Sequence, residues 1–144
     1  FDMSCNLRHI GITVVDMEKS LKLYRDIFNL KVVWDRIEEG KFIDKILGYD
    51  NINVRTVKLS DSNGFILELL QYFSHSREKN TDEPMRIGCS HFAITVESAE
   101  STYNDLRDFG LIFISEPTVS DDGKAVVAFC RDMNEVLIEI VEQV

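Results

Sequence analysis

The sequence predicts an α+β fold built from two tandem βαβββ modules. Two apolar segments, one in the middle of the chain and one at its end, each carry a single acidic residue at an equivalent place, Glu68 and Glu139. Each of these runs is preceded by a segment of alternating pattern that carries a histidine near its start, His9 or His91, and that is followed by residues at helical spacing. These matches indicate an internal repeat of roughly 70 to 80 residues.

In the first module, alternation predicts strands and a 3.6-residue period predicts helices. The first strand places His9, Gly11 and Thr13 on one face, and Asp16 is a good N-cap for the helix that follows. The expected elements are a strand at 7–15, a helix at 17–28, a strand at 31–37, a short helix at 41–47, and strands at 52–59 and 64–73.

The last of these strands contains the apolar run Phe65 to Leu70, with Glu68 in its middle. Its composition predicts a strand buried on both faces. An unpaired carboxylate there would cost several kcal/mol or would take up a proton. We therefore expect a cation or a hydrogen-bond donor beside Glu68, and beside Glu139 in the equivalent run.

The second module follows a polar segment that has no periodicity. Ser98 is a suitable cap for its helix, and Gly110 stands past the helix end. The expected elements are a strand at 89–96, a helix from 99 to 109, a strand at 111–115, a loop at 116–124, and a hairpin of 125–131 and 135–142. The whole chain, 1–144, is expected to be one domain, with module one at about 7–73, a linker at about 74–88 and module two at about 89–142.

Composition limits the classes of function. The 144 residues are 44% hydrophobic, and no apolar run approaches the roughly 20 residues of a membrane span. The net charge of −9 argues against a nucleic-acid or anionic-membrane partner, but leaves a small-molecule substrate open. With no export signal visible, we expect a cytoplasmic protein. The three cysteines lack CxxC spacing and indicate reduced thiols, with Cys89 and Cys130 in the core.

The repeat also predicts a site. If the modules pack about a pseudo-twofold axis, His9, Glu68, His91 and Glu139 converge, and imidazole with carboxylate suits a divalent transition metal. Four protein ligands in an octahedral arrangement leave positions for water or substrate, as catalytic sites do. Alternatively, the histidines bond to backbone and the glutamates pair with arginines. The coincidence of four residues at equivalent places favours the metal.

Several segments resemble the vicinal oxygen chelate superfamily, which includes glyoxalase I, methylmalonyl-CoA epimerase, extradiol dioxygenases, and fosfomycin and bleomycin resistance proteins. The segments are 7–14, 20–30, 65–72, 90–96 and 136–139. The resemblance implies that the modules form a curved, cup-shaped mixed sheet with flanking helices around the metal. It also implies a homodimer, with the site within one chain or between subunits.

Within that superfamily, the ligand set is similar to bacterial glyoxalase I, a lyase/isomerase that acts through a metal-bound enediolate. The resemblance implies one divalent ion (Ni, Zn, Co, Mn or Fe) held by His9, Glu68, His91 and Glu139. It implies catalytic roles for Glu139, which shuttles the proton, and for Glu68. Thr13 and Tyr72 stand where glyoxalase I usually has an arginine and an asparagine that help hold glutathione, so the substrate stays open.

Three alternatives remain at this point. A methylmalonyl-CoA epimerase-like isomerase also acts through an enolate stabilised by a metal, although it commonly has glutamine at the place of Glu68. A dioxygenase-like enzyme uses Fe(II) with two histidines and one glutamate. A resistance-type binding protein of the bleomycin class needs no metal ligands.

Overall fold

A computed structural model describes residues 3–79 and 83–144. It divides into two compact units, 1–78 and 79–144, and each is described by itself. Each unit has one mixed β-sheet with helix, so the predicted α+β class with tandem βαβββ-like modules is confirmed. The inclusion of both units in one domain stays a prediction. No helix in the described ranges has the length and apolar character to cross a membrane.

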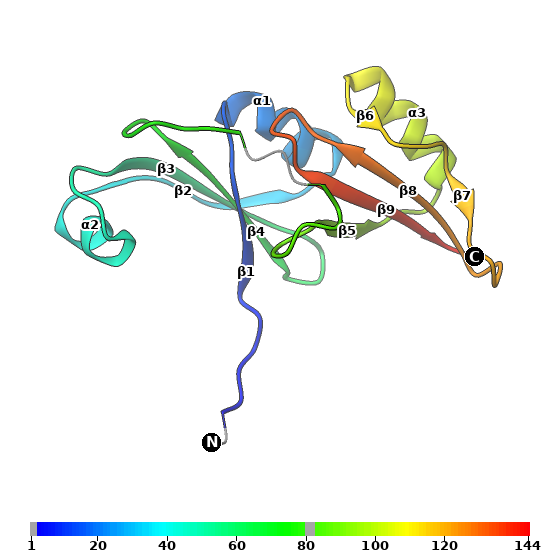
Figure 1. The fold of residues 1–144 in the computed structure, drawn as a ribbon, viewed down its shortest axis with the longest axis horizontal. Coiled ribbons are helices and arrows are strands. Elements are labelled where there is room, and N and C mark those ends of the chain that lie inside the picture. Colours follow the sequence, from blue (N-terminus) through cyan, green and yellow to red (C-terminus); the bar gives the residue numbers. More distant parts are fainter. Residues whose placement is uncertain (1–2, 80–82) are drawn as a thin grey trace. The chain divides into compact units, whose positions relative to one another are not determined.

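The first unit has a four-stranded sheet in the order β1-β4-β3-β2, and Figure 1 labels its strands. Strand β1 runs parallel to β4, and the other neighbours are antiparallel. The elements are β1 (His9–Thr13), α1 (Met17–Leu21), a π-helix η1 (Lys22–Ile27) that continues α1, β2 (Lys31–Glu39), α2 (Lys41–Leu47), β3 (Asn53–Ser60) and β4 (Ile66–Tyr72).

Helix α1 begins where the sequence predicts. The Asp16 carboxylate accepts a hydrogen bond from the Lys19 backbone N–H, which satisfies one of the free amides of the first turn. Met17 and Tyr24 are fully buried, and the chain leaves the helical segment through Asn29, whose φ is 57°. The backbone N–H of Met17 also donates to the Gln71 side chain at 2.8 Å, which ties α1 to β4.

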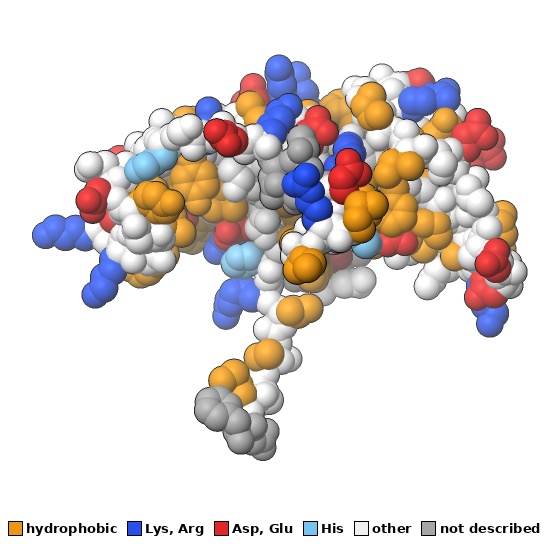
Figure 2. All heavy atoms as spheres, in the orientation of Figure 1, with side chains coloured by type: hydrophobic (Ala, Val, Ile, Leu, Met, Phe, Trp, Pro, Cys, Tyr) orange, Lys and Arg blue, Asp and Glu red, His pale blue; other side chains and the backbone are white. Residues whose placement is uncertain are grey.

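Helix α2 packs against residues of the sheet. Ile43 forms a buried cluster with Ile52 and Val54, and Leu70 and Tyr72 pack against that cluster. The helix ends at Gly48, which adopts the left-handed conformation. The outer side is apolar and open: Phe42, Ile46 and Tyr49 are all more than half exposed, and hydrophobic side chains are visible around α2 in Figure 2.

Strand β4 differs from the expectation that it is buried on both faces. Leu67 and Leu69 are buried, whereas Ile66, Glu68 and Leu70 are only partly buried. The residues alternate because one face meets the core beneath α1 and the other is incompletely covered. The Glu68 carboxylate therefore keeps some contact with solvent, and its desolvation cost is smaller than for a strand covered on both sides.

The second unit repeats the topology. Its sheet has the order β5-β9-β8-β6, with β5 parallel to β9 and β7 paired to β8. The elements are β5 (Phe92–Thr95), α3 (Ala99–Phe109), β6 (Ile112–Phe113), β7 (Thr118–Val119), β8 (Ala125–Arg131) and β9 (Leu137–Gln143). As predicted, Ser98 caps α3 by accepting from the Ser101 backbone N–H, and Gly110 ends it with a φ of 116°.

Two expectations for this unit are wrong. The segment 116–124 was predicted to be a loop, but it contains β7, because Thr118 pairs with Val127 of β8. Cys89 was expected in the core, but it is exposed, because β5 begins only at Phe92. Cys130 on β8 is buried as predicted, and burial raises the pKa of its thiol to about 12.

Candidate metal centre

The first unit brings its predicted histidine and glutamate together. His9 is the first residue of β1 and Glu68 lies on β4. The parallel register pairs Gly11 with Glu68, so His9 lies two residues earlier on the strand beside the carboxylate. The His9 Nε2 atom is 3.6 Å from the Glu68 Oε2 atom, and the Glu68 side chain is 14% exposed.

The second unit makes the same arrangement. His91 immediately precedes β5, and the register pairs Ala93 with Glu139 of β9, as Gly11 is paired with Glu68. The His91 Nε2 atom is 3.1 Å from Glu139 Oε2. The Ser90 hydroxyl lies 2.9 Å from the other ring nitrogen, Nδ1. The sequence repeat is therefore also a repeat of strand register.

The two pairs differ in the residue opposite each glutamate on the antiparallel neighbour. Lys58 is opposite Glu68, with its Nζ atom 3.9 Å from Oε2. Phe129 is opposite Glu139, and its ring contacts the His91 ring edge-to-face at 5.1 Å. Among the described residues, no lysine or arginine pairs with Glu139. Glu68 is therefore held by a local positive charge, and Glu139 is not.

The second pair has the spacing of neighbouring ligands of one metal ion, and the first pair is slightly wider. Ligands about 2.1 Å from a metal are about 3.0 Å apart at a right angle and about 3.4 Å apart at a tetrahedral angle. The measured 3.1 Å matches this range, and 3.6 Å lies just above it. Imidazole nitrogen and carboxylate oxygen are also ligands that Ni, Zn, Co, Mn and Fe accept.

Each unit by itself supplies two such donors. No group of three or more His, Cys, Asp or Glu placed to hold a metal occurs in the part of the chain that the structure describes. The set of four ligands, one pair from each unit, stays a prediction. The alternative that arginines neutralise the glutamates is not what the first unit shows, because Lys58 is the cation beside Glu68.

Other charged groups lie on the same face of the first sheet as Glu68. Strand register places Trp34 opposite Lys58, and both Arg36 and Lys58 lie over the Trp34 ring, at 4.5 and 5.2 Å from its centroid. Tyr72 lies on this face too, and burial together with the Glu68 charge raises the pKa of its hydroxyl.

Arg55 belongs to the opposite face of that sheet. Its guanidinium bonds to both carboxylate oxygens of Asp35 and to Glu18 of α1. Because these bonds already engage the guanidinium on the α1 side of the sheet, Arg55 cannot serve a ligand bound beside Glu68.

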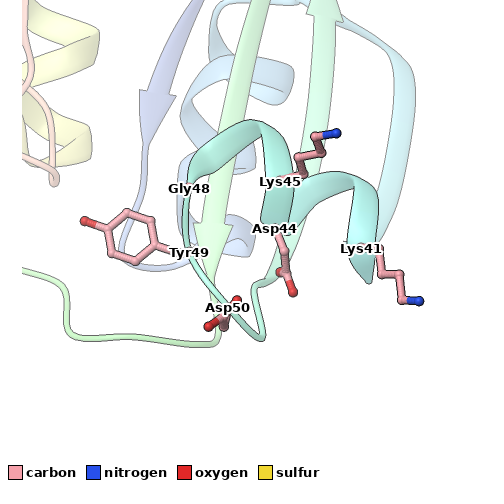
Figure 3. A pocket seen from close by; sticks show the side chains of 6 residues that line it. All are labelled: Lys41, Asp44, Lys45, Gly48, Tyr49 and Asp50. Atoms are coloured by element: carbon pink, nitrogen blue, oxygen red, sulfur yellow. The ribbon is translucent and has the colours of Figure 1, made fainter.

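An open hollow of about 360 Å³ lies along α2 and the turn that follows it, lined by Lys41, Asp44, Lys45, Gly48, Tyr49 and Asp50. In Figure 3 the Tyr49 ring points away from the two lysines. The Asp44 carboxylate is engaged by the backbone N–H groups of Asn51 and Ile52. The lining groups do not converge on one point, so the hollow does not extend the candidate centre.

The sequence predicts the two histidine–glutamate pairs that the structure brings together, but not two of their neighbours. Lys58 could have been identified by counting outward from the turn at 61–64, because an antiparallel hairpin places it opposite Glu68. Ser90 stands next to His91 in the sequence, but its hydrogen bond depends on the ring orientation, which no sequence pattern indicates.

Comparison with known proteins is consistent with this geometry. A family model described as the Glyoxalase/Bleomycin resistance protein/Dioxygenase superfamily matches residues 6–140. The chain is 32% identical over 152 residues to a lactoylglutathione lyase of Schizosaccharomyces pombe, covering 99% of this chain but only 49% of that protein. It is 28% identical to a probable lactoylglutathione lyase of Synechocystis, covering 94% of each.

A solved structure shares the fold. The crystal structure of a glyoxalase family protein from Bacillus cereus superposes with a TM-score of 0.90 at 16% identity, covering 99% of this chain and 97% of that one. The chain thus spans about half of the fission-yeast relative and nearly all of the cyanobacterial one. The family match over residues 6–140 shows that this chain belongs to the glyoxalase/bleomycin resistance protein/dioxygenase superfamily.

Proposed function

We propose that this chain is a divalent-metal-dependent lyase/isomerase of the glyoxalase I type. The observation that carries the proposal is the histidine–glutamate pair repeated in the same strand register, His9 with Glu68 and His91 with Glu139. The two relatives named lactoylglutathione lyase support the same reaction class. Together the pairs supply two imidazoles and two carboxylates, a set that holds one divalent ion and leaves room for a substrate.

The bound ion would polarise the carbonyl and hydroxyl oxygens on two adjacent substrate carbons, which acidifies the C–H bond of the hydroxyl-bearing carbon. Glu139 takes that proton, the C–H electron pair becomes a carbon–carbon double bond as the carbonyl π pair moves onto its oxygen, and Glu139 returns the proton to the former carbonyl carbon. The hydroxyl proton moves to the other oxygen, so the reaction is an isomerisation without a net redox change. Glu139 suits this role better than Glu68, because the Lys58 ammonium group pairs with the Glu68 carboxylate and stabilises its negative charge.

We propose a homodimer with a small-molecule substrate. Thr13 and Tyr72 do not offer the charged and amide groups that glyoxalase I uses for glutathione, so the thiol portion of the substrate is expected to differ from glutathione. Arg36 and Lys58 are the cations on the face of Glu68 that such a substrate can meet.

The first test is the metal content of the protein purified without chelator. About one equivalent of divalent metal per chain is expected, and both His9→Ala and His91→Ala should lose it, because one ion needs both pairs. Two equivalents, with one lost in each variant, would show separate sites. If neither the wild type nor metal-supplemented protein takes up Ni, Co, Zn, Mn or Fe(II), the enzyme proposal fails and a binding protein remains.

The second test is turnover by the metal-loaded protein. Hemithioacetals of methylglyoxal with glutathione and with coenzyme A are supplied in D₂O, and product formation and deuterium incorporation are followed by NMR. Metal-dependent isomerisation of either compound supports the reaction class, and efficient turnover of the glutathione compound would contradict the expectation that the thiol portion differs from glutathione. Oxygen consumption with a catechol, in place of isomerisation, would assign the chain to the dioxygenase branch.

A further inference from the structure

We propose that Ser90 is a positioning residue that fixes the proton of His91 on Nδ1 and leaves Nε2 free to bind a cation. The Ser90 hydroxyl has two neighbours, the Pro84 carbonyl oxygen at 3.3 Å and His91 Nδ1 at 2.9 Å. A carbonyl oxygen only accepts, so both contacts are hydrogen bonds at the same time only when the single hydroxyl proton goes to Pro84. The Ser90 oxygen can then act toward His91 only as an acceptor, which requires a proton on Nδ1.

The consequence appears at the other ring nitrogen. A neutral imidazole with its proton on Nδ1 presents a lone pair at Nε2. In that tautomer the lone pair faces the Glu139 Oε2 atom, 3.1 Å away, and two acceptor atoms then meet without a proton between them. A cation held by both atoms removes this repulsion. The contact with Phe129 restrains the ring in the same orientation.

This arrangement is a property of the second unit. Metal-binding histidines commonly donate their other ring N–H to an outer oxygen, which sets the tautomer and the ring orientation. Ser90 supplies that oxygen to His91. At His9 the preceding residue is Arg8, and within the described residues no hydrogen bond is made to the His9 Nδ1 atom. His9 therefore serves as an internal control for His91 in the same molecule.

The test has two readouts, on the wild type, Ser90→Ala and Ser90→Thr. Long-range ¹H–¹⁵N spectra of metal-free protein at about pH 8.5, well above the ordinary histidine pKa, report the tautomer of each of the three histidines. Competition titration with Co²⁺ or Zn²⁺ reports metal affinity. Ser115→Ala, which removes an exposed hydroxyl that donates to the Glu116 backbone carbonyl, is the matched control.

We expect the Nδ1–H tautomer at His91 in the wild type, in Ser90→Thr and in the control. In Ser90→Ala, the His91 proton should move to Nε2 and donate to Glu139, and metal affinity should fall about 10-fold or more. The His9 signals should not change. An Nε2–H tautomer in the wild type would overturn the proposal, as would a folded Ser90→Ala protein with unchanged tautomer and affinity.

The metal readout rests on the proposed function, whereas the tautomer readout does not. If the wild type binds no metal but His91 shows the serine-dependent Nδ1–H tautomer, the proposed function fails and the role of Ser90 stands. If the wild type binds metal tightly but the His91 tautomer is the same with and without the Ser90 hydroxyl, the proposed function stands and the role of Ser90 fails.

Discussion

Glu139 is the side chain on which the proposed reaction depends, and the residue scale gives the first prediction. Replacing Glu139 with glutamine keeps the shape but removes the base, so turnover should fall by about 10²- to 10⁴-fold. The fold should persist, since the Glu139 side chain is 24% exposed. Steady-state kinetics of the metal-loaded variant, with circular dichroism as a check on folding, measure this.

Glu116→Gln, which changes an exposed carboxylate outside the site, is the matched control and should keep wild-type turnover. A Glu139→Gln protein that turns over substrate at the wild-type rate with metal bound would transfer the proton-shuttle role elsewhere, with Glu68 as the next candidate. Comparison with Glu68→Gln then separates the two carboxylates.

At the scale of the sheet, Trp34 should report metal binding. It is the single tryptophan of the chain, and Lys58 lies between its ring and Glu68. A metal that takes up the Glu68 carboxylate competes with Lys58, whose ammonium group then shifts relative to the indole. Titration with a divalent metal should therefore change Trp34 fluorescence.

Lys58→Met should still bind metal but should show no change of Trp34 fluorescence on binding, since the ammonium group near both Trp34 and Glu68 is gone. Arg36→Met, which removes the other cation over the same ring, should retain it. Emission that stays constant at saturating metal in the wild type would contradict the link between Lys58 and Glu68.

The opposite face of the same sheet predicts a dependence of stability on pH. The hydrogen bonds from Arg55 hold the pKa of the Asp35 carboxyl below its ordinary value. A carboxyl whose pKa is lowered in the folded state stabilises the fold above the unfolded pKa, and this contribution disappears as pH falls through the folded pKa. Asp35→Asn should lower the free energy of unfolding at pH 7 by about 0.5–1 kcal/mol, typical of a partly exposed pair.

Urea unfolding at several pH values measures the difference in the free energy of unfolding between the wild type and Asp35→Asn. This difference should shrink toward zero as the pH falls below about 4. Asp105→Asn, an exposed change on α3, should show no such trend. A deficit in Asp35→Asn that is the same at pH 3 and pH 7 would mean that the substitution acts through packing instead of charge.

The elements themselves show what local pattern can and cannot predict. Helix α2 has the predicted bounds, because Gly48 stops it and its apolar stripe is regular. The short strand β7 was missed, because its two residues depend on pairing with distant β8 and carry no pattern of their own. The two histidine–glutamate pairs could be predicted because they repeat along the sequence, whereas the Ser90 contact depends on the orientation of one side chain in the fold.

At the scale of the whole molecule, the repeat raises the question of which two units share an ion. Each unit carries one histidine–glutamate pair, so a complete set of ligands can come from one chain or from unit one of a chain and unit two of its partner. The two arrangements bind metal in the same ratio, so stoichiometry does not separate them. Mixing inactive variants does.

His9→Ala removes a proposed ligand from the first unit, and His91→Ala removes one from the second unit. Each variant alone should therefore be inactive. If the ligands of one ion come from different chains, a mixed dimer contains one intact set, because the undamaged units of the two variants meet there. Random exchange of subunits should then restore about a quarter of the sites. If the ligands come from one chain, every site in the mixed dimer lacks a histidine, and mixing restores nothing. Metal content and turnover after co-refolding equal amounts of the two variants therefore decide where the centre forms, with separately refolded samples as the control.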